Sequence, residues 1–229
     1  MALIRGVVFD LDDTLYLERD YVRSGFEYIA RLISETTDLS QELLFHTLME
    51  IFASGKHGKV FDELLIRYPE ISFFFQVSDL VEAYRAHKPR IELLPGALMM
   101  LHRLKENKRL MAILSDGNVV SQRAKLDVLG LYGITDCIVL TDEWGKDFWK
   151  PHPRGFEEIA RRLCFPPHEL VYIADNPTKD FIAPNRLGWH TIRLRIPGQL
   201  HFATEPLIPE AAPENECSGF EEIMDLLEV

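Results

Sequence analysis

The sequence contains little cysteine and lacks any long apolar run. Its three cysteines, Cys137, Cys164 and Cys217, are odd in number and far apart, which argues against a disulfide framework and a zinc knuckle. No apolar run approaches the ~18 residues that a membrane-spanning helix requires. The first residues also lack the basic and apolar pattern of a secretory leader. We therefore expect a cytoplasmic protein with no membrane partner.

Positive charge is scarce as well. The chain has 25 Lys and Arg residues against 36 Asp and Glu residues, which gives a formal net charge of -11. Such an excess of negative charge disfavours nucleic acid as a partner. The common nucleotide-binding patterns are also absent, because there is no GxGxxG and no Gly-Lys pair is followed by Ser or Thr. The eight histidines show no HxH or HExxH spacing, which disfavours a zinc site.

Short apolar runs alternate with amphipathic stretches over much of the chain. The apolar runs span residues 3–11, 110–115, 136–141, 169–175 and 189–195, and helical patterns span 96–107, 118–129, 153–164 and 178–187. Apolar runs of this length are typical of parallel strands that are covered on both faces. The alternation therefore predicts an α/β fold, a Rossmann-like parallel sheet with helices around it.

About ninety residues between the first two predicted strands contain no convincing strand. They carry helical patterns at 18–35, 40–53, 60–68 and 78–87. This segment is too long for a crossover and too regular for a loop, so we predict a helical insert over residues 17–90. Residues 1–16 and 91–229 then form the Rossmann-like core. Near the end of the chain, Ser218 and Glu221 form a predicted capping box for a closing helix.

Polar side chains follow the ends of the predicted strands, where open α/β sheets bind their ligands. They are Asp10, Asp12 and Thr14 after the first strand, Ser115 and Asp116 after the second, Lys150 before the helix at 153–164, and Asp175 and Asp180 after the fourth. Two carboxylates about 4 Å apart repel each other by about 4 kcal/mol at an effective dielectric constant of about 20. One lysine cannot offset several such pairs, whereas a hard divalent cation can. Mg²⁺ is the usual ion where carboxylates meet a phosphate.

The tripeptide Asp12-Asp13-Thr14 could instead serve only as the N-cap of the helix that follows it. Asp and Thr commonly cap helices, and a helix is predicted directly downstream. An EF-hand loop that starts at Asp10 fits poorly, because its sixth residue is Leu15 instead of Gly and its twelfth is Tyr21 instead of Glu. Taken singly, Ser115 and Lys150 are ordinary strand-end and loop residues.

The order of four motifs carries more information than any one of them. The segments VVFDLDDTL, ILSDGN, KPHP and IADNPTKD follow one another along the chain and together resemble the haloacid dehalogenase (HAD) superfamily of phosphohydrolases. The resemblance covers residues 4–16 and 91–195. It implies a Mg²⁺-dependent phosphatase that hydrolyses a small organic phosphomonoester, a sugar phosphate or a nucleoside monophosphate, through an aspartyl-phosphate intermediate. It also implies that the helical insert is a cap domain.

The resemblance further implies roles for the residues that react with the phosphate or bind it. Asp10 is the expected nucleophile, and Asp12 is the expected acid that protonates the leaving oxygen and then activates water. Lys150 would neutralise the nucleophile and the phosphate. Ser115 would bind a phosphoryl oxygen, together with the backbone N–H of Asp116. The anionic side chain of Asp116 departs from the family pattern, and we expect it to point away from the phosphate.

The metal site is likewise implied by the resemblance. Asp10, the backbone carbonyl of Asp12, and Asp175 would hold Mg²⁺. Thr14 and Asp180 would support the site.

Two alternative functions stay open. A phosphomutase of the same superfamily uses the same residues and differs mainly in excluding water. A non-catalytic phosphate-binding or signalling protein is the second alternative. A dehalogenase is disfavoured, because cleavage of a carbon–halogen bond needs no proton donor at Asp12.

The predicted cap contains one cationic turn. Lys56, His57 and Lys59 lie in a segment that also carries Gly55 and Gly58. In a protein of this net charge such a turn is a candidate for contact with an anionic substrate. A solvated surface turn is the alternative.

Overall fold

The structure, a computed structural model, describes residues 3–229. The chain forms two compact units. Unit 1 comprises the residues up to Arg19 together with Ile91–Val229, and unit 2 comprises Asp20–Arg90. No helix in the described part of the chain is both long and apolar enough to cross a membrane.

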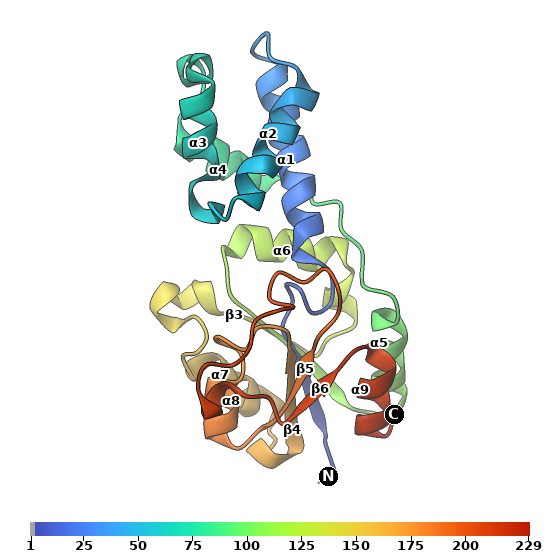
Figure 1. Ribbon diagram of the computed structural model, residues 1–229. Coiled ribbons are helices and arrows are strands. Elements are labelled where there is room, and N and C mark those ends of the chain that lie inside the picture. Colours follow the sequence, from blue (N-terminus) through green and yellow to red (C-terminus); the bar gives the residue numbers. More distant parts are fainter. Residues whose placement is uncertain (1–2) are drawn as a thin grey trace. The chain divides into compact units, whose positions relative to one another are not determined.

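Unit 1 is built on a parallel sheet with the strand order β3-β2-β1-β4-β5-β6 (Figure 1). Its strands are β1 (Gly6–Phe9), β2 (Leu110–Ser115), β3 (Cys137–Leu140), β4 (Leu170–Ala174), β5 (His190–Leu194) and β6 (Asn215–Cys217). Phe9 lies in register with Ile113 of β2 and Ile173 of β4. The carboxyl ends of these three strands therefore meet at one edge of the sheet. This edge is a topological switch point, because β2 and β3 lie on one side of β1 and the later strands lie on the other side. The predicted Rossmann-like α/β fold is confirmed.

Helices cover both faces of this sheet. They are α5 (Ala97–Glu106), α6 (Val119–Val128), α7 (Arg154–Leu163), α8 (Ile182–Leu187) and α9 (Phe220–Leu227). Helices α5 and α9 lie side by side on one face, and α7 and α8 lie on the other (Figure 1). The ring of Phe156 in α7 packs edge-to-face on Tyr172 of β4 and on Trp189, with centroids 4.9 and 5.6 Å away. Burial on both faces explains why the central strands are continuously apolar.

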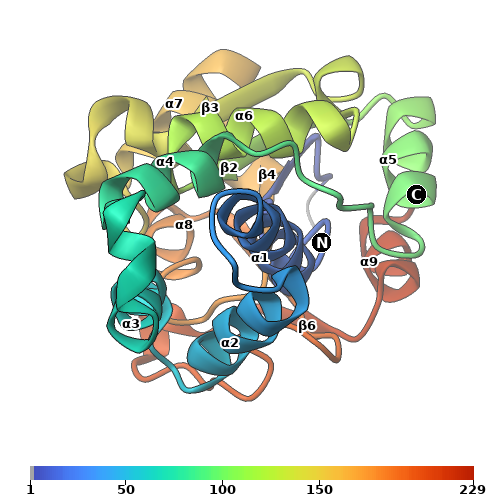
Figure 2. The same cartoon turned by 90° about the horizontal axis from the view of Figure 1, so that it is seen from above.

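Unit 2 is helical and has its own apolar core. Its helices are α1 (Glu18–Ser34), which begins in unit 1, α2 (Gln41–Ala53), α3 (Val60–Arg67) and α4 (Val77–Ala86). Helix α3 lies between α2 and α4 (Figure 2). Phe26 of α1 contacts the rings of Phe52, Phe61 and Tyr84, which ties all four helices together. The core therefore consists of the apolar face of each amphipathic helix.

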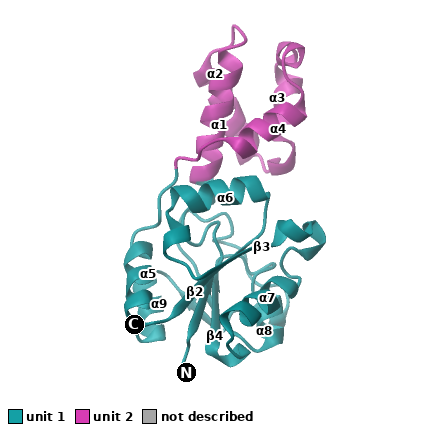
Figure 3. Ribbon diagram, turned by 180° about the vertical axis from the view of Figure 1, so that it is seen from behind, with its two compact units in different colours: residues 1–19, 91–229 teal, residues 20–90 magenta. Residues whose placement is uncertain are grey.

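The boundaries differ from the predicted ones at a few points. The prediction divided the chain after residue 16, whereas the first boundary between the compact units follows Arg19, inside α1 (Figure 3). Strand β6 was not predicted, because its three residues, Asn-Glu-Cys, are too few and too polar to show a strand pattern. The predicted capping box is wrong. Gly219 is the N-cap of α9, so the backbone N–H of Ser218 donates to Glu222 (2.8 Å) and not to Glu221.

Unit 2 yields a test of its packing at Gly25. A Cβ atom at this position would lie 2.6 Å from Cδ2 of Tyr84, and closer still to Cε2, inside the helical core. We expect Gly25→Ala to lower the free energy of unfolding by roughly 1–3 kcal/mol, the usual cost of overpacking. Urea unfolding followed by circular dichroism would measure the change. Gly58→Ala is the matched control, because a Cβ there meets nothing within 4 Å. Equal stability of the two variants would contradict the packing described for α1 and α4.

Candidate active site

A tight turn follows β1 and separates the three carboxylates of the first motif. Asp10 continues the strand, because its N–H donates to the carbonyl of Ile173 (2.9 Å). Asp13 has a left-handed backbone (φ 52°), and its side chain accepts from the N–H groups of Glu18 and Leu200, both at 2.7 Å. Because Glu18 is the first residue of α1, the capping interpretation holds for Asp13. The carboxylates of Asp10 and Asp12 have other partners.

A buried lysine lies between the carboxylates at the end of the sheet. Nζ of Lys150 is 2.8 Å from Oδ1 of Asp10, 2.9 Å from Oδ1 of Asp180, and 2.9 Å from the hydroxyl of Tyr172. Asp10, Asp175 and Asp180 each offer a carboxylate oxygen within 4.8 Å of the others. Tyr172 was missed in the sequence, because a tyrosine inside an apolar strand looks like an ordinary core residue.

The carboxylates outnumber the cations at this site. Burial raises the pKa of Asp10 to about 7, although the Lys150 ammonium opposes that shift. Burial, and then the charges of Asp180 and Asp10, raise the pKa of Asp175 well above its ordinary value. For Lys150, burial lowers the pKa, but the surrounding acidic groups, Asp10 and Asp180 foremost, more than compensate together and raise it well above its ordinary value. The site therefore favours additional positive charge.

The donor set fits a hard divalent cation. Oδ2 of Asp175 is buried and has no hydrogen-bond partner within residues 3–229. An acceptor in that state is costly unless something else binds it. Nε of Arg193 donates to the carbonyl oxygen of Asp175 (3.0 Å), which fixes the backbone there. The carboxylates of Asp10, Asp175 and Asp180 come together here. The Asp12 carboxylate instead accepts from Gln122 and Lys125. For the predicted metal site, Asp12 therefore offers its backbone carbonyl.

The Asp12 carboxylate is bound by side chains from α6 and by Tyr16, the residue that follows the first motif. It accepts from Nζ of Lys125 (2.6 Å), from Nε2 of Gln122 (2.7 Å) and from the hydroxyl of Tyr16. Burial raises the pKa of Asp12, but Lys125 and the other hydrogen-bond donors together outweigh burial, and the pKa falls below its ordinary value. Gln122 and Lys125 were missed, since polar residues in a helical pattern usually lie on its solvated face.

The serine motif lies at the end of β2, as its sequence position predicts. Ser115 is fully buried, and its Oγ accepts from Nε2 of Gln122 (2.6 Å). The Asp116 carboxylate accepts from Oγ1 of Thr141 (2.7 Å), from the backbone N–H of Lys150 (3.1 Å) and from Nζ of Lys179 (2.9 Å). Asp116 therefore holds the lysine loop and a second cation, Lys179, which sequence reasoning missed.

The remaining predicted residues are Thr14 and those of the cationic turn in unit 2. Thr14 is fully buried, and its hydroxyl has no hydrogen-bond partner in the described part of the chain. In unit 2, Lys56 pairs with Glu63 (2.8 Å), and the ring of His57 packs on Phe52 with centroids 4.3 Å apart. Lys59 is exposed in the same turn. Contact of this turn with a substrate stays a prediction.

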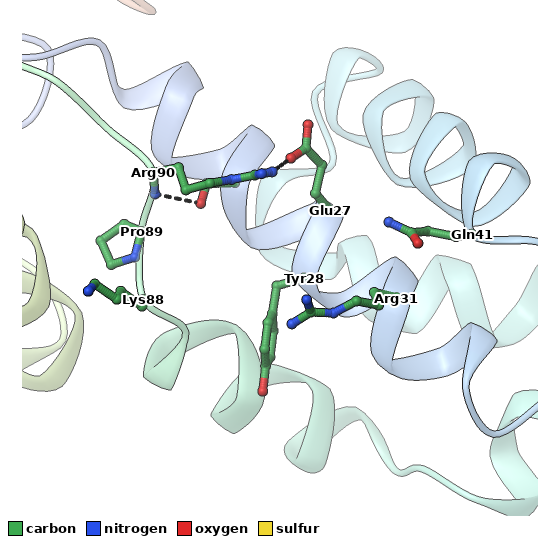
Figure 4. Close-up of a pocket in the computed structure, with 8 residues that line it drawn as sticks. Glu27, Tyr28, Arg31, Gln41, Lys88, Pro89 and Arg90 are labelled. Carbon is green, nitrogen blue, oxygen red and sulfur yellow. Dashed lines mark hydrogen bonds and ion pairs between the residues drawn. The ribbon is translucent and has the colours of Figure 1, made fainter.

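Unit 2 also contains a cavity of about 430 Å³ (Figure 4). Glu27 forms an ion pair with Arg90, whose backbone N–H donates to Oγ of Ser24 (2.8 Å). The guanidinium of Arg31 lies over the ring of Tyr28 at 5.5 Å. Ser24, Glu27, Tyr28 and Arg31 share one face of α1, whereas Arg90 lies far from them in the sequence, so no local pattern could have predicted its proximity.

Comparisons with known proteins agree with this geometry. The sequence model of the haloacid dehalogenase-like hydrolases matches residues 4–188. A glyceraldehyde 3-phosphate phosphatase of Methanopyrus kandleri is 32% identical over an alignment of 234 positions, which covers 98% of this chain and 97% of that enzyme. An enzyme of the same name from Methanocaldococcus jannaschii is 29% identical over 203 residues, which cover 84% of this chain and 85% of that one.

A solved structure extends the agreement to the fold. The magnesium-bound HAD hydrolase YfnB of Bacillus subtilis superimposes with a TM-score of 0.68 at 20% identity, and the match covers 99% of each chain. The expected enzyme class, a phosphoric monoester hydrolase, is confirmed by the comparisons. On the family match together with the motifs that it spans, this chain belongs to the haloacid dehalogenase-like hydrolases.

Proposed function

We propose that this protein is a magnesium-dependent phosphatase that hydrolyses glyceraldehyde 3-phosphate, or a closely similar sugar phosphate, through an aspartyl-phosphate intermediate. One observation carries the proposal: the buried Lys150 lies within 2.9 Å of Asp10 and Asp180 at the end of the sheet. The substrate class is supported by the names of the relatives from Methanopyrus kandleri and Methanocaldococcus jannaschii.

In the first half of the proposed reaction, a carboxylate oxygen of Asp10 attacks the phosphorus atom. The bond between phosphorus and the leaving oxygen breaks, and Asp12 gives that oxygen a proton. Asp12 enters this step protonated, although its donors favour the carboxylate when no substrate is bound. Lys150, 2.8 Å from Asp10, orients the nucleophile and neutralises charge on the phosphoryl oxygens. The products are the free sugar and a phosphorylated Asp10.

In the second half, water attacks the phosphorus atom of the phosphorylated Asp10. Asp12, now deprotonated, takes a proton from that water. The bond between phosphorus and the carboxylate oxygen breaks, which releases inorganic phosphate and restores Asp10. Asp12 thus serves first as acid and then as base.

Binding of the phosphoryl group is assigned to Ser115, Lys150 and the backbone N–H of Asp116. The negative side chain of Asp116 does not exclude a phosphate nearby, because Lys179 and Thr141 bind that carboxylate. Lys179 thereby offsets the negative charge of Asp116 close to the site.

Asp10, the Asp12 carbonyl and Asp175 would hold Mg²⁺, with Asp180 in support, and the ion would stabilise negative charge on the transferring phosphoryl group. The buried Oδ2 of Asp175 without a donor supports this assignment. Thr14 would support the loop that carries Asp10 and Asp12.

Unit 2 is proposed as the helical cap. Its cationic turn, with Lys56, His57 and Lys59, is a candidate for substrate selection. Among the alternatives, the hydrolase family match argues against a non-catalytic protein, and the phosphatase relatives argue against a phosphomutase.

The acid role of Asp12 predicts a dependence on the leaving group. Asp12→Asn should lower kcat/KM for glyceraldehyde 3-phosphate by roughly 100-fold or more, the usual contribution of a placed acid. It should lower kcat/KM for 4-nitrophenyl phosphate much less, because 4-nitrophenolate leaves without a proton. The ratio kcat/KM is the right quantity, because it excludes the later hydrolysis of phosphorylated Asp10.

Asp10→Asn is the comparison variant for this experiment. An amide is not a nucleophile, so both substrates should lose all measurable turnover while circular dichroism stays unchanged. Equal losses on the two substrates in Asp12→Asn would argue against acid catalysis by Asp12. Turnover by Asp10→Asn at the wild-type rate would contradict the proposed aspartyl-phosphate mechanism.

The metal assignment predicts stabilisation by Mg²⁺ as well as activation. EDTA should abolish activity and Mg²⁺ should restore it. At about 100 times its Kd, the ion should add about 2.7 kcal/mol of stability, which corresponds to a rise in Tm of roughly 5–10 °C for a chain of this size. Asp175→Asn should remove most of that rise, whereas Asp147→Asn, at an exposed position, should keep it. A rise of the same size in Asp175→Asn, or restoration by Zn²⁺ but not by Mg²⁺, would contradict the assignment.

A further inference from the structure

Two buried polar side chains of α6 have no part in the reaction described above. Gln122 is 1% exposed and Lys125 is 5% exposed. They are three residues apart, so they lie on the same face of the helix. Burial of a lysine is unfavourable unless a partner compensates for the lost water. Both side chains donate to the Asp12 carboxylate.

Gln122 connects two functional groups through one nitrogen atom. Its Nε2 lies 2.7 Å from Oδ2 of Asp12 and 2.6 Å from Oγ of Ser115. An amide nitrogen carries two hydrogens, one for each acceptor. The opposite orientation of the amide would set two oxygens against each other at Asp12. Gln122 therefore links the expected acid to the expected phosphate-binding serine.

Lys125 holds the other oxygen of the same carboxylate. Its Nζ is 2.6 Å from Oδ1 of Asp12, which also accepts from the hydroxyl of Tyr16. Each carboxylate oxygen of Asp12 thus has a donor from α6, and the group is held in one orientation. The start of α6 is itself fixed, because Oδ1 of Asn118 caps the backbone N–H of Val120.

We propose that Gln122 and Lys125 are positioning residues for Asp12, and that Gln122 also positions Ser115. The inference rests on the proposed acid role of Asp12. Neither side chain exchanges a proton with the substrate. Their effect is to keep the carboxyl group of Asp12 in the orientation from which it reaches the leaving oxygen.

Lys125→Met tests the effect on the acid. The replacement has a similar length and suits a buried position, but it donates no hydrogen bond. We expect kcat/KM for glyceraldehyde 3-phosphate to fall by roughly 10- to 100-fold, part of the full contribution of a placed acid. For 4-nitrophenyl phosphate the fall should be about threefold or smaller. The Ki of inorganic phosphate should change little, because the donor to Ser115 is Gln122, which this variant retains.

Gln122→Met should produce a different combination of effects. It should show the same dependence on the leaving group, and it should also raise the Ki of inorganic phosphate by roughly three- to tenfold, about the worth of one hydrogen bond. The reason is that Ser115 loses the donor that fixes its hydroxyl. If Lys125→Met does not fold, the Gln122 variant carries the test alone. An unchanged Ki together with equal losses on both substrates would overturn the inference.

Arg123→Met is the matched control. Arg123 lies on the same helix and is exposed, and it pairs with Glu143 (2.7 Å) instead of Asp12. Its replacement removes one positive charge from α6, and we expect both kcat/KM values to stay at the wild-type level. Circular dichroism and Tm would verify folding of every variant. A loss in Arg123→Met that matches the loss in Lys125→Met would assign the effect to helix charge and overturn the positioning role.

A double variant separates positioning from an independent role. If Lys125 acts through Asp12, then Asp12→Asn combined with Lys125→Met should lose no more kcat/KM than Asp12→Asn alone. Additive losses would overturn the inference. A leaving-group effect in Asp12→Asn but none in Lys125→Met would overturn the positioning role and leave the proposed function intact. No such effect in Asp12→Asn itself would overturn the acid role, and the inference with it.

Discussion

The charge of Lys150 is the interaction on which the rest of the site depends. A lysine side chain with no exposed surface is tolerated because two carboxylates and a tyrosine hydroxyl lie within 2.9 Å of it. Those carboxylates, in turn, tolerate burial because the lysine lies between them. The groups come from β1, from β4 and from the loops after β3 and β4, so the parallel sheet must form before any of these charges is stabilised. The fold and the electrostatics of the site therefore depend on each other.

Much of the fold could be predicted because its causes are local. The central strands are buried on both faces and so are apolar throughout, and the amphipathic helices carry a clear period. The motif residues could be placed because parallel strands end at a common edge. Strand β6 could not be predicted, since its polar residues become a strand only by pairing with β5. The same holds for the start of α9, where one residue of difference moves the partner of Ser218 from Glu221 to Glu222.

Three of the site residues that sequence reasoning missed share one physical cause. Gln122, Lys125 and Lys179 are residue types that are usually exposed, and nothing in their local patterns distinguishes them from solvated side chains. They take part in the site only because carboxylates from other segments need donors there. Asp116 shows the converse. Its negative charge was unexpected beside a phosphate site, and its bonds with Lys179, Thr141 and the loop of Lys150 explain it.

The interruption of unit 1 by unit 2 has a consequence for synthesis of the chain. Strand β1 lies at the centre of the sheet, but its neighbour β2 begins at Leu110, after all of unit 2 has been made. Unit 2 is continuous in sequence, and the bond from the Arg90 N–H to Ser24 joins its two ends. Folding of unit 2 first would therefore bring β1 and β2 closer together and shorten the loop that their pairing must close. During synthesis on the ribosome, unit 2 is therefore complete before β2 and β4, the strands that pair with β1, have been made.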